Sequence, residues 1–117
     1  MHDLSAAERQ RAVCDRHSVA FAPPAAGSML GYALAAKNDS GPLNGLRHRP
    51  EGGTSGWYVW RGETLSAADD FFQPIHVEHL VEEDPQVLDF LALPPGWRFL
   101  VDGDRVDVWF DATLLAI

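Results

Sequence analysis

The stretch WRFLVDGDRVDVWF, residues 97–110, decides the fold of this chain. Apolar side chains occupy every second position in residues 97–101 and again in residues 106–110, and Asp102-Gly103-Asp104 separates the two runs. A period of two puts the apolar side chains of each run on one face of a strand. Asp-Gly is a strong signal for a tight turn. The stretch therefore predicts an antiparallel hairpin.

Helical signals predominate before this hairpin. Pro94-Pro95-Gly96 cannot continue a helix and ends the helical region. Asp84-Pro85 is typical of an N-cap followed by proline at the first helical position, which predicts a short helix over residues 85–91. Residues 66–83 also favour a helix, with an interruption at Pro74. The sequence thus predicts a helical middle segment.

Further strands are expected before the helical segment. The aromatic and β-branched run at residues 57–60 has the composition of a central strand, and residues 29–36 read as a buried strand. Residues 37–56 contain five glycines and two prolines and predict turns with one brief strand. Strands that flank a helical middle favour an α+β fold with a mainly antiparallel sheet.

The N-terminal region predicts a peripheral helix. Ser5-Ala6-Ala7-Glu8 fits a capping box, so we expect a helix from about Ser5 to Arg16. Its apolar stripe is weak, which favours loose packing. Pro23-Pro24 then ends helical structure. We expect residues 1–28 to form this helix and a connector, and residues 29–117 to form one small α+β domain.

Charge is distributed unevenly along the chain. The formal net charge is -8 at pH 7; residues 1–61 carry seven basic and five acidic side chains, and residues 62–117 carry two and twelve. An acidic field repels phosphate backbones and speeds encounters with basic partners. We therefore expect no direct binding of nucleic acid. The same carboxylates also serve solubility, and composition alone does not separate the two roles.

Composition argues against several other classes of protein. The longest weakly apolar stretch, residues 29–36, is far shorter than the roughly 20 residues of a membrane span. The first sixteen residues carry charge throughout and lack the apolar run of a secretory signal, which favours a cytoplasmic protein. Cys14 is the single cysteine, so an internal disulfide or a thiolate cluster cannot form. No cofactor is expected.

The string most typical of an enzyme is His76-Val77-Glu78-His79. Two imidazoles at i and i+3 on a helix share a face and can hold a metal ion, with Glu82 or Glu83 nearby. The helical motifs of zinc hydrolases and zinc deaminases require further residues that this sequence lacks. The alternative is that both rings cap the helix or pack beside Phe71 and Phe72.

Two smaller groups are candidates for other chemistry. Asp69 and Asp70, with Glu63 upstream, suit acid–base catalysis if their environments separate their proton affinities. In the first turn of a helix, the same aspartates would stabilise the positive end of its dipole. Arg47, His48 and Arg49 form a small basic island in a region that we expect to consist mostly of turns, and Arg47 and His48 are the loop candidates.

Four segments together resemble a known family. They are residues 45–48, 55–63, 76–80 and 93–99. Over residues 29–115 the chain is similar to small bacterial proteins that carry the immunity-protein domain numbered thirty-three, formerly a domain of unknown function. The resemblance implies a protein that protects bacteria from polymorphic toxins used between competing cells. It implies no catalytic residues.

The leading hypothesis is a non-catalytic binding domain, an immunity protein that neutralises a toxin through an acidic, aromatic-containing surface. Tryptophan is a favoured interface anchor, and carboxylates steer basic partners. Candidate residues for this surface are Trp57, Trp60, Asp69, Asp70, Glu78, Glu82 and Glu83, with Arg47 and His48 as loop candidates. Packing in the core is the alternative for each tryptophan, although a regular strand cannot bury residues 57 and 60 on one face.

Two rival hypotheses come from other classes. One is a metal-dependent or acid–base enzyme centred on His76 and His79, and the other is a regulatory module for a small ligand. A basic toxin domain is the expected partner under the leading hypothesis. The sequence leaves the oligomeric state open.

Overall fold

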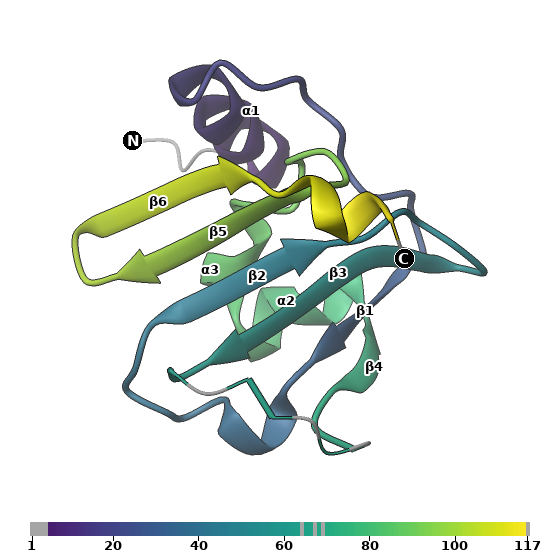
Figure 1. The fold of residues 1–117 in the computed structure, drawn as a ribbon, viewed down its shortest axis with the longest axis vertical. Coiled ribbons are helices and arrows are strands. Elements are labelled where there is room, and N and C mark those ends of the chain that lie inside the picture. Colours follow the sequence, from purple (N-terminus) through teal and green to yellow (C-terminus); the bar gives the residue numbers. More distant parts are fainter. Residues whose placement is uncertain (1–4, 64, 67, 69, 117) are drawn as a thin grey trace.

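The protein is built on one mixed β-sheet (Figure 1). The computed structural model describes residues 5–63, 65, 66, 68 and 70–116. Within them the strand order is β4-β1-β3-β2-β5-β6, and only β1 and β3 are parallel neighbours. The strands are β1 Met29–Tyr32, β2 Leu43–Arg47, β3 Thr54–Arg61, β4 Gln73–His76, β5 Trp97–Asp102 and β6 Arg105–Phe110. The predicted α+β class and the hairpin are confirmed.

Helices cover one face of this sheet. They are α1 Ala6–Arg16, α2 Leu80–Glu83 and α3 Pro85–Leu88. The chain also forms the 3-10 turns η1 Leu34–Ala36, η2 Val77–His79 and η3 Ala112–Leu115. In Figure 1, α2 and α3 lie behind the sheet, whereas the yellow C-terminal turn lies in front of it. The main core fills the space between the sheet and the helices. Trp57 and Phe99 from the strands meet Leu80 and Leu91 there, all at most 1% exposed.

The predicted N-terminal helix is present and joins the main core. The Ser5 hydroxyl accepts from the Glu8 amide at 3.2 Å, which is half of the expected capping box. Val13 and Cys14 are buried in the main core, and the Gln10 side chain donates to the Leu88 carbonyl at 2.9 Å. The division of the chain at residue 28 stays a prediction. A truncation at residue 28 would remove these contacts between α1 and the main core.

The prediction of a helix over residues 66–83 was wrong for the described residues before Val77 and right for residues 77–83, which form η2 and α2. Gln73–His76 is an edge strand, β4, and helical structure begins only at Val77. Pro74 pairs with Gly31 in this strand, and proline is tolerated there because an edge strand needs only one side of its backbone for pairing. The predicted strand over residues 29–36 is also shorter, since β1 ends at Tyr32.

The predicted start of a helix at Pro85 is confirmed, but its cap is not. Asp84 makes no side-chain cap, and α3 ends at Leu88 rather than at residue 91. The Asp84 carboxylate instead accepts hydrogen bonds from Tyr32 and Arg61. Its burial in this cluster outweighs the weaker benefit of capping a one-turn helix.

Candidate functional site

The sheet face opposite α2 and α3 carries a second, partly uncovered apolar cluster, here called the open face. Alternation along β3 sends Trp57 to the main core and Tyr58 and Trp60 to the open face. Phe71 and Phe72 pack on it from the loop before β4, and its other members are Ala33, Ala36, Leu46 and Leu114. The described helices α1 and α3 and the Leu80 side chain of α2 contribute to the main core, so the half-buried aromatic rings of the open face border solvent.

Neither of the two predicted tryptophan anchors lies on the surface. Trp57 is 0% exposed, and its indole N–H donates to the Leu91 carbonyl at 2.9 Å. Trp60 is 4% exposed and packs within the open-face cluster. An anchor must reach its partner, so the expectation of tryptophan anchors on β3 is not met in this conformation. The accessible ring of this strand is that of Tyr58, which the sequence analysis missed.

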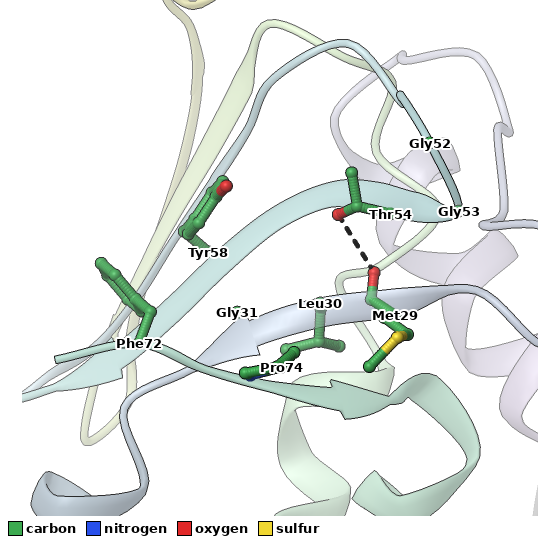
Figure 2. Close-up of a pocket in the computed structure, with 9 residues that line it drawn as sticks. All are labelled: Met29, Leu30, Gly31, Gly52, Gly53, Thr54, Tyr58, Phe72 and Pro74. Atoms are coloured by element: carbon green, nitrogen blue, oxygen red, sulfur yellow. Dashed lines mark hydrogen bonds between the residues drawn. The ribbon is translucent and has the colours of Figure 1, made fainter. Parts of the chain in front are cut away.

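A hollow of about 280 Å³ opens on the open face between β1 and β3 (Figure 2). Its cause is an irregular ladder: Met29 pairs with Thr54, but Gly31 pairs with Tyr58, so β3 advances four residues while β1 advances two. Gly31 keeps the floor open, since a β-carbon there would lie 2.7 Å from the Tyr58 ring. The lining residues are Met29, Leu30, Gly31, Gly52, Gly53, Thr54, Tyr58, Phe72 and Pro74.

Two further hollows adjoin the first at Tyr58. One, of about 230 Å³, is apolar and lined by Leu46, His48, Tyr58, Leu65 and Phe72. The other, of about 490 Å³, is more polar and lined by His48, Arg49, Pro50, Glu51, Thr54, Gly56 and Tyr58. Tyr58 thus stands at the junction of three recesses, and Phe72 borders the two apolar ones.

Side chains from distant segments hold the Tyr58 ring in place. Phe72 meets it edge-on with ring centroids 5.2 Å apart, and His48 does so at 5.5 Å. The His48 ring is itself oriented by η3, because its Nδ1–H donates to the Leu114 carbonyl at 3.0 Å. His48, a loop candidate from the sequence, lines two of the three hollows. Aromatic contacts of this geometry favour a preformed surface.

Arg47, the other loop candidate, has a different position. It is the last residue of β2 and is 3% exposed, so it is neither in a loop nor at the surface. Its guanidinium donates to four backbone carbonyls, those of Ala22, Ser55, Leu91 and Leu93. Burial lowers the pKa of Arg47 to about 10. Arg47 connects segments of the main core instead of facing a partner.

The predicted acidic candidates are spread over several contacts. Asp69 lies outside the described residues, and the exposed Asp70 lies in the loop before β4. Glu78 accepts from the Gly27 amide at 2.9 Å, and backbone hydrogen bonds from Glu78 itself and Gly27 lower its pKa. Glu83 pairs with Lys37 at 3.0 Å, and Glu82 is exposed. None of these four described acids lines the hollows around Tyr58.

His76 and His79 lie together on the surface. Their rings meet edge-on with centroids 5.6 Å apart, and His76 Nδ1 lies 3.3 Å from the Gly27 carbonyl oxygen. They belong to β4 and η2 rather than to one helix. Over the described part of the chain, no group of three or more His, Cys, Asp or Glu side chains could hold a metal ion. Among the described residues, neither imidazole makes the expected ring contact with Phe71 or Phe72.

The fold defines a small α+β domain with an aromatic, hollowed sheet face. The profile of the Imm33-like domain matches residues 9–111, and the chain belongs to this family. The match begins inside α1, upstream of the resemblance expected from the sequence. The family name suggests immunity proteins, whose partners are proteins. Neither the curated proteins nor the solved structures contain a match. No helix within the described ranges is long and apolar enough to cross a membrane.

Proposed function

We propose that this protein is an immunity protein that neutralises a cognate toxin by binding it, without catalysis, through the open face around Tyr58. The observation that carries the proposal is the meeting of three hollows at one half-buried tyrosine. Membership of the Imm33-like family supports a protein partner. Tyrosine is enriched among the residues that dominate binding energy at protein interfaces.

The two apolar hollows define what a partner must present. The Tyr58 and Phe72 rings line both of them, so a segment crossing these rings can place an apolar side chain in each. The third hollow adds polar groups from His48, Arg49 and Glu51. An apolar centre with a polar rim is the usual anatomy of a protein interface. We therefore expect apolar anchors from the toxin at Tyr58.

Leu65 provides the sharpest test of this surface. It lines the smaller apolar hollow and is 50% exposed. We expect Leu65→Asn to weaken toxin binding about tenfold or more, because the partner would have to desolvate an amide in an apolar recess. The measurement is the dissociation constant for the toxin encoded beside this gene, together with the growth protection that co-expression provides.

Val81 supplies the matched control. It is an exposed apolar residue, 63% accessible, on α2, away from the open face. Val81→Asn should leave binding unchanged, and neither variant should alter stability appreciably. If the toxin encoded beside this gene is not neutralised by the wild-type protein, the proposed immunity function is wrong. If it is neutralised equally by both variants, the function stands and the open face is the wrong surface.

The acidity of the chain predicts how the toxin arrives. With a net charge of -8, the protein should attract a basic toxin at long range, and salt should screen that attraction. We expect the association rate constant to fall about fivefold or more between roughly 50 and 500 mM salt, with a smaller change in dissociation rate. Glu82→Gln should lower the association rate, and Gln86→Asn, an uncharged exchange nearby, should not. A salt-independent association rate would contradict steering.

A further inference from the structure

The two edges of the sheet differ in how well they can accept another strand. β4 is a four-residue edge interrupted by Pro74, and proline blocks strand addition. β6, the opposite edge, has six residues, no proline and two exposed aromatic side chains, Trp109 at 38% and Phe110 at 50%. Figure 1 shows β6 as the upper border of the sheet. A regular edge of this kind is a template for pairing.

The hairpin geometry identifies the backbone groups that β6 leaves free. The Asp111 amide donates to the Gly96 carbonyl at 2.7 Å, so residues 96 and 111 form a hydrogen-bonded pair. Hydrogen-bonded and non-hydrogen-bonded pairs alternate along an antiparallel ladder. The backbone N–H and C=O groups of Arg105, Asp107 and Trp109 therefore also point towards β5. The N–H and C=O groups of Val106, Val108 and Phe110 therefore point outward. Outside the strand ladders, no hydrogen bond between described residues uses these groups.

We propose that the protein self-associates by antiparallel pairing of β6 with β6 of a second copy, about a two-fold axis at Val108. In this register Val108 faces itself, and Val106 faces Phe110 of the second copy. Arg105 then lies opposite Asp111, an opposite-charge pair. All three outward-facing residues of each strand find hydrogen-bonding partners.

Charge selects this register over its neighbours. A two-fold axis at Asp107 would place that carboxylate directly opposite its own copy. An axis at Trp109 would place Asp107 opposite Asp111 of the second copy. Like charges directly opposite one another destabilise a strand pair. Only the axis at Val108 combines opposite charges with an apolar pairing of Phe110 and Val106.

The expected dimer is weak. One strand pair contributes less area than the roughly 1,600 Å² of a standard interface, so we expect a dissociation constant of tens of micromolar or weaker. Two chains of charge -8 also repel each other. The pairing leaves the hollows around Tyr58 outside the interface, since β6 and β3 are separated by β5 and β2.

Sedimentation of the full chain between about 10 µM and 1 mM tests the proposal, and wild-type protein should show a concentration-dependent dimer. Val108→Pro removes one outward N–H that β5 does not use, and should weaken dimerisation at least about tenfold. Val108→Thr keeps the N–H and the β-branched shape, so its dimer should persist. Circular dichroism checks that each variant is folded.

Cysteine cross-linking tests the register. Opposite residues of a hydrogen-bonded pair have α-carbons about 5.5 Å apart, within disulfide range, so Val108→Cys should cross-link on mild oxidation. Val106→Cys should not, because its two copies would lie about 13 Å apart along the strands. Cys14 is buried, so we expect it not to cross-link. A monomer at every concentration, or equal cross-linking of both variants, would overturn the proposal. The proposal would also be overturned if the wild-type protein is a monomer and Val108→Pro loses toxin binding. That result would assign the β6 edge to the toxin interface.

Discussion

Replacing Arg47 with leucine should lower the free energy of unfolding by about 3–5 kcal/mol. The guanidinium donates to the carbonyls of Ala22 at 2.7 Å, Leu93 at 2.8 Å and Ser55 at 3.0 Å. A buried carbonyl left without its donor costs about 1–3 kcal/mol. The Leu91 carbonyl, 3.4 Å from Arg47, would keep its bond from the Trp57 indole. Urea unfolding of both proteins measures the difference.

Arg47→Lys is the informative control. Lysine keeps the positive charge, but one ammonium cannot reproduce a planar group that reaches the connector, β3 and the loop after α3 together. We expect the free energy of unfolding of Arg47→Lys to lie between those of the wild type and Arg47→Leu. Because the pKa of Arg47 remains about 10 despite burial, the side chain stays charged at neutral pH. The effect should therefore be constant between roughly pH 6 and 8. A loss under about 1 kcal/mol in Arg47→Leu would mean that water replaces the guanidinium.

The sequence predicts this fold best where one residue pattern serves one structural role. Residues 97–110 alternate because one side of each hairpin strand packs on the core, and the turn carries Asp-Gly. β4 has no such pattern, since Gln73, Pro74 and His76 are exposed. An edge strand with little buried surface carries no alternation, so helical preferences elsewhere in residues 66–83 dominated the prediction.

The candidate site was only partly predictable. The spacing of Trp57 and Trp60 places them on opposite faces of a strand, as observed. What covers the second face could not be inferred, because Phe71, Phe72 and Leu114 reach it from segments far apart in the sequence. The position of Tyr58 could have been predicted, because it lies between two residues of β3 that face the main core and so must face the other way. The hollow beside it depends on an irregular β1–β3 ladder, which no local pattern encodes.

Arg47 and His48 show the same limit at neighbouring positions. The sequence presents them as one basic island, yet alternation along β2 sends Arg47 beneath the helices and His48 to the open face. Burial of a cation depends on carbonyls that three other segments supply. Neighbouring residues thus divide into one that maintains the core and one that borders the proposed interface.

Asp84→Ala should be the second most destabilising single change, with a loss of about 3–4 kcal/mol in the free energy of unfolding. The carboxylate is 6% exposed. It accepts from the Tyr32 hydroxyl at 2.7 Å and from two guanidinium N–H groups of Arg61 at 2.9 and 2.7 Å. Removing it leaves a buried phenol and a largely buried cation without their shared partner, which is costly because neither regains full hydration.

A double-mutant cycle with Tyr32→Phe separates the contributions of this cluster. Tyr32→Phe alone should cost about 1–2 kcal/mol, and the two losses should not add, because both remove the same hydrogen bond.

Burial, followed by the bond to Asp84, raises the pKa of Tyr32 well above its usual value. A phenol whose pKa is higher in the folded state stabilises the protein below its unfolded pKa of roughly 10, and this contribution is lost as pH rises further. Unfolding measured up to about pH 11 should therefore show a steeper alkaline decline in wild type than in Tyr32→Phe. Additive losses in the cycle would show that Tyr32 and Asp84 stabilise the protein independently. Equal alkaline slopes would show that folding does not raise the pKa of Tyr32.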